Sequence, residues 1–162
     1  MFLVWINDFG NPFYTAVRVG KDEKTFKMFK LRSMIVNADK TGVDSTSNND
    51  MRITRIGKFI RKFKMDELSQ LINVLLGDMS FVGPRPALFN QFDLINLRTK
   101  KKIHLLIPGI TGLAQINGRD LLSINEKVLY DYEYLIKRSF FFDIKIIIIT
   151  VIKLFTSKEI TH

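Results

Sequence analysis

The sequence contains no cysteine and only two histidines, His104 and His162, among its 162 residues. Without cysteine the chain has no disulfide framework, no thiol nucleophile and no cysteine-ligated zinc site. Two histidines argue against a multi-histidine metal site and leave few candidates for a serine–histidine triad. The phosphate-binding loop G-x-x-x-x-G-K-[ST] and the dinucleotide fingerprint G-x-G-x-x-G are both missing, and no zinc-finger or RNA-recognition signature supports nucleic-acid binding.

Long hydrophobic runs are missing as well. No stretch reaches the roughly 20 apolar residues that are needed to cross a bilayer. The nearest is residues 140–155, FFFDIKIIIITVIKLF, which Asp143, Lys145 and Lys153 interrupt. Residues 1–6 are apolar, but they are too few for the hydrophobic part of a signal peptide, and no small-residue cleavage site follows them. We therefore expect neither a cleaved signal nor a membrane-spanning helix.

The chain is basic, with 25 Lys and Arg against 16 Asp and Glu and a formal net charge of +9. Its length fits a single domain of about 100–200 residues. Residues 51–64 carry six basic side chains and no acid, and residues 98–102 form a second basic cluster. Such clusters suit phosphate-rich partners, namely nucleotides, nucleic acid or an anionic membrane surface. The alternative is an ordinary solvated surface.

Hydrophobic periodicity predicts an α+β fold that is mostly helical, with a short N-terminal β-hairpin followed by amphipathic helices and long loops. The hairpin strands are expected at residues 13–19 and 25–32, separated by a turn. Apolar residues at helical spacing predict the helices, while glycine and proline predict the loops between them. The expected helices are 52–63, 68–76 (ended by Gly77), 88–102 and 124–135, and the expected loops are 37–50, 83–86 and 108–119.

Residues 140–155 fit either a strand, which a run of isoleucine favours, or a helix, which the length favours. As a helix, the segment places Asp143, Thr150 and Lys153 near one stripe. The rest of its surface is nearly all apolar, so such a helix lies either in the core or flat in a membrane interface. Abundant Phe and Ile with flanking Lys favours a membrane-interface helix.

The acidic pair Asp66-Glu67 stands where the predicted helix 68–76 begins. In the plainer interpretation, Asp66 is the N-cap and Glu67 is a first-turn acid that the helix dipole favours. In the functional interpretation, the same dipole keeps Asp66 ionised, so that it can act as a nucleophile on phosphorus. Two adjacent acids can also share Mg²⁺, which prefers oxygen ligands. Gln70 and Asn73, on the same side of this helix, are candidates for orienting polar groups there.

Several basic side chains are candidate phosphate contacts. The prolines of Gly83-Pro84-Arg85-Pro86 stiffen the backbone around Arg85, whose guanidinium suits a phosphate, although a plain turn with an exposed arginine has the same pattern. Lys30 and Arg32 are two residues apart in a strand pattern and therefore share one face. That face either provides a second phosphate contact or is a solvent-exposed sheet surface. The basic helix adds Arg52, Arg55 and Arg61, which either hold a diphosphate, contact lipid headgroups or are simply solvated.

Taken together, these segments resemble the bacterial sugar transferase family, the small monotopic polyprenyl-phosphate phosphoglycosyl transferases. The resemblance covers about residues 10–155 and rests on blocks that follow the family's order. These blocks are 18–21 (RVGK), 29–34 (FKLRSM), 49–57 (NDMRITRIG), 66–68 (DEL), 71–75 (LINVL), 77–86 (GDMSFVGPRP) and 108–119 (PGITGLAQINGR).

The resemblance implies transfer of a sugar 1-phosphate from a UDP-sugar to undecaprenyl phosphate, with release of UMP, which initiates the synthesis of a cell-surface polysaccharide or glycan. It implies Mg²⁺ as the cofactor, Asp66 as a nucleophile that forms an aspartyl-linked phosphosugar, and Glu67 with Asp66 at the metal. It places Arg85 at phosphate. Gln115 and Arg119 of the last block complete the expected phosphate-binding and substrate-binding set with the basic candidates named above.

The family also has an N-terminal hydrophobic helix that enters the membrane and bends back. Here residues 1–9 are the candidate remnant of such an anchor, and residues 10–162 are the expected catalytic domain. The expected location is the cytoplasmic face of the bacterial inner membrane, or solution if the anchor is absent. Two alternatives stay open: an inactive fragment that lacks its anchor, and a basic module that binds nucleic acid.

Overall fold

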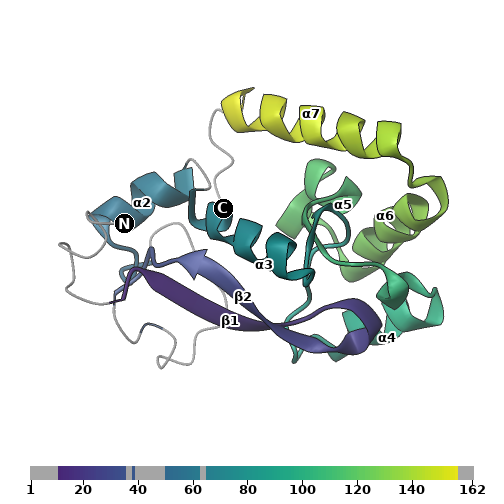
Figure 1. The fold of residues 1–162 in the computed structure, drawn as a ribbon, viewed down its shortest axis with the longest axis horizontal. Coiled ribbons are helices and arrows are strands. Elements are labelled where there is room, and N and C mark those ends of the chain that lie inside the picture. Colours follow the sequence, from purple (N-terminus) through teal and green to yellow (C-terminus); the bar gives the residue numbers. More distant parts are fainter. Residues whose placement is uncertain (1–10, 36–37, 39–49, 63–64, 157–162) are drawn as a thin grey trace.

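The computed structural model describes residues 11–35, 38, 50–62 and 65–156, and Figure 1 shows their arrangement. A β-hairpin opens this part of the chain: β1 (Phe13–Val19) and β2 (Thr25–Leu31) are antiparallel and are joined through the 3-10 helix η1 (Lys21–Glu23). Ala16 lies opposite Met28 in this register, and both side chains are buried. Because side chains alternate along a strand, this pair marks the hairpin face that packs against the rest of the protein.

Helices make up most of the remaining structure. In chain order they are α2 (Arg55–Lys62), η3 (Met65–Gln70), α3 (Leu71–Leu76), α4 (Phe92–Lys100), η4 (Ile103–Leu105), α5 (Leu113–Ile116), η5 (Arg119–Leu121), α6 (Ile124–Lys137) and α7 (Phe140–Thr156). α3 ends at Gly77, whose φ of 82° is the left-handed conformation that glycine adopts readily. α6 begins with a capping box between Ser123 and Glu126.

Two short parallel strands, β3 (Ser80–Val82) and β4 (Gly109–Thr111), bring distant parts of the chain together. A Cβ on Gly109 would lie only 2.1 Å from the nitrogen of Gly83, so this crossing needs glycine. The N–H of Gly83 donates to the carbonyl of Thr111 (2.9 Å), and the N–H of Gly109 donates to the carbonyl of Pro84 (3.0 Å). These bonds hold the start of residues 83–86 (GPRP), the glycine–proline loop, against β4.

The hydrophobic core has two parts. The larger part is formed by β3, η4 and helices α4 to α7, and the smaller part joins the hairpin to the segment after α3. The buried residues of the larger part are Val82, Ala87, Leu94, Ile103, Leu106, Ile116, Val128, Tyr134 and Ile146, and those of the smaller part are Ala16, Met28 and Met79. The hairpin is therefore attached by a small apolar contact, which leaves room for polar groups on the same face.

Asn73 on α3 strengthens that attachment. Its side chain is completely buried: Oδ1 accepts from the N–H of Phe29 (2.9 Å), and Nδ2 donates to the carbonyl of Lys27 (2.8 Å). Buried backbone groups need such partners, because an unpaired one costs free energy comparable to a lost hydrogen bond. The amide of Asn73 is thus committed to the backbone of β2 rather than to the acidic pair.

The expected α+β, mostly helical fold is confirmed. The predicted strand 13–19 coincides with β1, the predicted helix 124–135 lies within α6, and residues 140–155 are helical as part of α7. The predicted loop at 37–50 lies mostly outside the described residues, as do residues 1–9.

The prediction that residues 108–119 form a loop is wrong. This stretch holds β4, α5 and the first residue of η5. Its glycines signal close backbone contact rather than irregular structure: a Cβ on Gly112 would lie 2.1 Å from the carbonyl oxygen of Gly83. Glycine can mark either a turn or a close approach, and the sequence pattern does not separate the two.

α7 has the polar stripe that its spacing predicted, and this stripe points into the protein. Asp143, Thr150 and Lys153 each make a hydrogen bond to another element: to the hydroxyl of Tyr134 (2.8 Å), to the hydroxyl of Thr111 (2.7 Å) and to the carbonyl of Ile116, respectively. In Figure 1 this helix runs along the upper edge of the molecule, above α5 and α6. Within the described ranges, no helix combines the length and the apolar character needed to cross a bilayer.

Candidate functional site

The acidic pair lies on η3, which packs against β2 and runs directly into α3. Asp66 is a residue within η3, which begins at Met65, so the prediction that it caps the helix is wrong. A helix dipole would favour the ionised form of Asp66, but burial has the larger effect on the pKa of this residue. Burial raises the pKa of Asp66, the neighbouring Glu67 carboxylate raises it further, and Lys30 and Arg61 oppose this rise. Burial disfavours the charged carboxylate, and here it wins over local helix effects.

Glu67 is held by two arginines that lie far away in the sequence. Its Oε1 accepts a hydrogen bond from Nη2 of Arg119 (2.7 Å) and a longer one from Nη1 of Arg85 (3.5 Å). All three side chains are partly buried. Short charge-assisted contacts are strong and directional, so Arg119 mainly fixes where Glu67 points, and Arg85 adds a weaker contact. Asp66 differs: no Lys or Arg within the described ranges lies within 4.0 Å of its carboxylate.

The hairpin contributes two cations to this site. Lys30 and Arg18 lie on the face marked by Ala16 and Met28. Burial lowers the pKa of Lys30, repulsion by Arg85 lowers it further, and both Glu67 and Asp66 oppose the shift. Burial and Arg85 likewise lower the pKa of Arg18. These electrostatic couplings place Lys30 near the acidic pair and Arg85, and place Arg18 near Arg85 and Lys30.

Arg18 is absent from the expected set of site residues. The signal that could have found it is the register of the hairpin. Ala16 lies opposite Met28. On the same face, the next pair toward the turn is Arg18 with Phe26, and the next pair toward the open end is Tyr14 with Lys30. Alternation therefore puts Arg18 and Lys30 on one face, whichever residues that face contacts.

Arg61 joins the site from α2. Its Nε donates to Oγ of Ser33 (2.8 Å), which fixes the side chain at the end of the hairpin. Burial lowers the pKa of Arg61, and the charge of Asp66 is the largest opposing influence. Arg55, in contrast, is exposed at the beginning of α2. Of the basic helix, the structure therefore brings Arg61, but not Arg55, to the acidic pair.

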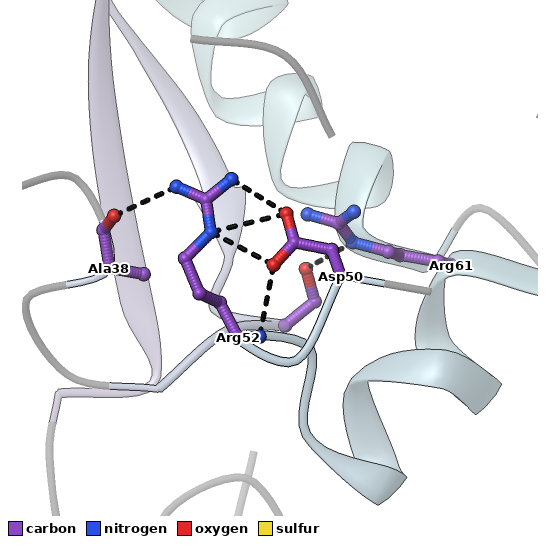
Figure 2. Close-up of polar contacts among 5 residues, drawn as sticks. Ala38, Asp50, Arg52 and Arg61 are labelled. Carbon is purple, nitrogen blue, oxygen red and sulfur yellow. Dashed lines mark hydrogen bonds and ion pairs between the residues drawn. The ribbon is translucent and has the colours of Figure 1, made fainter. Parts of the chain in front are cut away.

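Arg52 is committed to a different contact, which Figure 2 shows. Its Nε and Nη2 donate to the carboxylate of Asp50 at distances of 2.6–3.1 Å, and its Nη1 donates to the carbonyl of Ala38 (3.1 Å). This pair lowers the pKa of Asp50 to about 2, chiefly through hydrogen bonding to the side chain of Arg52. The guanidinium of Arg52 thus joins residues on either side of the segment 39–49, whereas the sequence suggested a phosphate contact.

The remaining expected residues are partly buried and carry unused polar atoms. Arg32 follows β2, and its Nη2 is buried without a hydrogen-bond partner among the described residues. Both amide atoms of Gln115 on α5 are in the same condition. Nε of Arg119 has no hydrogen-bond partner either, although it forms an ion pair with Oδ2 of Asp120 at 3.6 Å. Arg119 also adopts a φ of 53°, a conformation that is uncommon for a residue with a side chain. Buried polar atoms usually have partners, so these atoms are candidates for contact with a substrate.

The described residues contain no cluster of three or more His, Cys, Asp or Glu side chains that could enclose a metal ion. Asp66 and Glu67 provide carboxylate oxygens, and the cations near them are Lys30, Arg61, Arg85 and Arg119. Mg²⁺ is commonly bound by one or two carboxylates together with water and substrate phosphates, so this donor set fits Mg²⁺ bound jointly with a phosphorylated ligand. It does not fit a closed metal site made by protein alone.

An acidic pair surrounded by lysine and arginine is the arrangement expected in an enzyme that acts on phosphorylated substrates. The chain belongs to the bacterial sugar transferase family, whose model matches residues 1–157. The resemblance drawn from the sequence blocks is thereby confirmed.

Three relatives illustrate the similarity. The uncharacterized sugar transferase EpsL of Bacillus subtilis (strain 168) is 42% identical over 152 residues, which cover 93% of this chain and 74% of the relative. The UDP-glucose:undecaprenyl-phosphate glucose-1-phosphate transferase of Escherichia coli (strain K12) is 42% identical over 156 residues, 92% of this chain and 34% of the relative. The UDP-N-acetylgalactosamine-undecaprenyl-phosphate N-acetylgalactosaminephosphotransferase of Aeromonas hydrophila is 36% identical over 155 residues, 92% of this chain and 36% of the relative. The chain thus spans about a third of the length of the last two.

Proposed function

We propose that this chain transfers a sugar 1-phosphate from a UDP-sugar to undecaprenyl phosphate and releases UMP. The observation that carries the proposal is the arrangement around η3: Glu67 is held by Arg119 and Arg85, while Asp66 beside it forms no ion pair within the described part of the chain. Relatives named for undecaprenyl-phosphate transfer of glucose 1-phosphate and of N-acetylgalactosamine phosphate support the substrate class.

In the first step, a carboxylate oxygen of Asp66 attacks the phosphorus that carries the sugar. The new bond joins a carboxylate oxygen of Asp66 to this phosphorus. The bond from this phosphorus to the bridging oxygen of the diphosphate breaks, and UMP leaves with that oxygen and its electron pair. A carboxylate is a known nucleophile for phosphoryl groups. Its burial raises the pKa of Asp66 and leaves the carboxylate poorly solvated, which favours attack once it is ionised.

In the second step, a phosphate oxygen of undecaprenyl phosphate attacks the same phosphorus and displaces the carboxylate of Asp66. The products are a lipid diphosphate sugar and the free enzyme. Phosphoryl transfer depends mainly on positioning and on neutralising charge. Arg85, Arg119 and the hairpin cations Lys30 and Arg18 supply that positive charge around the reacting phosphates.

Asp66 and Glu67 are the residues proposed to hold Mg²⁺. When bound, Mg²⁺ neutralises diphosphate charge and orients its oxygens. The contribution of the protein is to keep the two carboxylates in place. Arg119 and Arg85 do this for Glu67 through its Oε1.

We further propose that α7 lies in the membrane interface, close to the lipid substrate. Because its polar stripe faces inward, its outer surface consists mostly of large apolar side chains, among which Lys145 is also exposed. Phe141 is 83% exposed, and Ile148 and Ile152 are each 53% exposed. An isolated soluble domain rarely leaves so many large apolar side chains together in water. A helix lying flat on a bilayer buries them among lipid chains, and a long lysine side chain can extend to the headgroups.

One assay tests the reaction. The protein is mixed with Mg²⁺, undecaprenyl phosphate in detergent and a panel of UDP-sugars, and UMP is measured. We expect one or more UDP-sugars to yield UMP, and we expect Asp66→Asn or chelation of the metal to abolish the release. Full activity in Asp66→Asn rules out the proposed nucleophile. Absence of UMP with every sugar, from protein shown to be folded, contradicts the proposed activity of this chain.

A second assay tests the membrane contact. Natural protein should sediment with vesicles of phosphatidylglycerol and phosphatidylethanolamine, and Phe141→Ser/Ile148→Ser/Ile152→Ser should remain in the supernatant. Val17→Ser is the matched control, since it removes an exposed apolar side chain from the hairpin (47% exposed). Equal sedimentation of the triple variant and the control would remove α7 from the proposed interface.

A further inference from the structure

A buried ion pair lies behind Arg85 and is not part of the acidic site. Arg98 on α4 donates from Nε (2.9 Å) and from Nη2 (2.6 Å) to Oδ2 of Asp131 on α6. The side chain of Asp131 is 2% exposed and that of Arg98 is 11% exposed. Burying two charges is costly, and replacing such a pair by apolar residues often leaves stability unchanged or improved. Stability alone therefore does not explain why these two charges are buried here.

The third contact of Arg98 suggests the reason. Its Nη1 donates to the backbone carbonyl of Arg85 (2.9 Å), in the middle of the glycine–proline loop. Asp131 occupies the opposite side of the same guanidinium and fixes its plane. Because α4 packs against α6, the ion pair between these helices holds one peptide group of the loop in a fixed position.

The rest of the loop is fixed through its backbone as well. Gly83 and Pro84 bond to β4, and the carbonyl of Ala87 accepts from the N–H of Val19 at the end of β1 (3.0 Å). Since Pro84 and Pro86 have no N–H, the carbonyl of Arg85 is the polar backbone group through which Arg98 reaches the middle of the loop. Arg98 therefore acts at the residue whose side chain reaches Glu67.

We propose that Arg98 and Asp131 are positioning residues: they hold the backbone of Arg85 so that its guanidinium points at the acidic pair and at the phosphates of the substrate. The side chain of Arg85 is 34% exposed and touches Glu67 only at 3.5 Å. Its own contacts thus hold its direction weakly, and the orientation depends on the fixed peptide behind it. This inference rests on the proposed function for its kinetic consequence, but not for its structural consequence.

The test uses the full chain with Arg98→Met/Asp131→Leu, which removes both charges together and leaves neither partner unpaired. We expect kcat/KM for UMP release to fall about 10- to 100-fold, since small misplacement of a positioning group costs this much. We expect the thermal midpoint to stay near that of the natural protein. The matched control, Glu133→Gln/Lys137→Gln, removes an exposed ion pair from the same helix α6 and should leave kcat/KM unchanged.

A double-mutant cycle separates positioning from general damage. If Arg98 acts through Arg85, then adding Arg98→Met/Asp131→Leu to Arg85→Lys should cost less than about 3-fold more, because coupled residues are not additive. Equal fold losses in the natural and Arg85→Lys backgrounds would overturn the proposal. If the double variant does not fold, Arg98→Lys takes its place, since it keeps a charge opposite Asp131 but lacks the guanidinium that reaches the carbonyl of Arg85.

A readout independent of activity completes the test. The carbonyl that Arg98 holds belongs to the Arg85–Pro86 peptide, which has no N–H. The ¹³Cα heteronuclear NOE of Arg85 therefore serves to report the mobility of the backbone at this residue. We expect the NOE to fall in Arg98→Met/Asp131→Leu and to stay high in the control. An unchanged NOE contradicts the positioning role. If the natural protein releases no UMP from any UDP-sugar, the proposed function fails, while the NOE comparison still decides whether Arg98 orders the loop.

Discussion

The guanidinium of Arg119 lies 2.7 Å from the carboxylate of Glu67, although the two residues are 52 positions apart. The contact is made possible by β4 and α5, which carry the chain past Gly83 and deliver Arg119 to η3. Arg119 makes this contact from a left-handed backbone conformation with a φ of 53°. The strain of that conformation is offset by a charge-assisted hydrogen bond at the site.

Arg119→Gln should lower kcat/KM for UMP release about 100-fold, in the range found when one donor is removed from a preorganised site. The reason is that Glu67 loses its 2.7 Å contact with Arg119, which is shorter than its 3.5 Å contact with Arg85. Steady-state kinetics measures the effect, and Arg138→Gln, at an exposed position just after α6, serves as the control. Wild-type kinetics in Arg119→Gln would show that this ion pair has no part in the reaction.

Asn73→Ala should lower the free energy of unfolding by about 2–4 kcal/mol, because it leaves the N–H of Phe29 and the carbonyl of Lys27 without their buried partner. Urea denaturation monitored by circular dichroism measures the change. Asn117→Ala is the matched control: this amide donates to the carbonyl of Leu113 from an exposed position, and its loss should cost less than about 1 kcal/mol. Equal costs for the two variants would contradict the role given to Asn73.

Gly112→Ala should destabilise the protein by about 3 kcal/mol or more, because the new Cβ would lie 2.1 Å from the backbone oxygen of Gly83. Gly77→Ala makes the same chemical change where no atom lies within 4 Å of the Cβ. It should cost only about 1 kcal/mol, which is the price of a left-handed conformation. Thermal unfolding compares the two, and the reverse order would mean that β4 and the glycine–proline loop do not cross so closely.

The ion pair between Asp50 and Arg52 predicts a pH dependence of stability. Hydrogen bonding to Arg52 lowers the pKa of Asp50 from 3.8 to about 2, so the folded state binds fewer protons than the unfolded state between these values. The pair therefore stabilises the protein fully above about pH 4 and loses its effect as the pH falls toward 2. The difference in unfolding free energy between natural protein and Asp50→Asn, measured by urea denaturation, should be constant from pH 7 to 5 and shrink below pH 4. A difference that does not change with pH would mean that Asp50 is unpaired.

Much of the fold follows from local pattern. The alternation of residues 13–19 predicts β1, and helical spacing predicts α6 and the polar stripe of α7, whose inward direction is set by the tertiary structure. Residues 108–119 could not be predicted in this way. Their glycines serve the close crossing of Gly83 with Gly109 and Gly112, which depends on a second segment of chain that no local window contains.

The sequence by itself determined which residues could carry the chemistry: an Asp-Glu pair, an arginine between two prolines and an excess of basic side chains. The tertiary structure decided which cations reach the acids. It brought Arg61 to Asp66 and Arg18 to Arg85, left Arg55 in solvent and committed Arg52 to Asp50. It also raised the pKa of Asp66 through burial, whereas a helix dipole alone would lower it. The physical reason is that charge interactions and desolvation depend on distance and burial in space, and for groups far apart in the chain only the folded arrangement sets these.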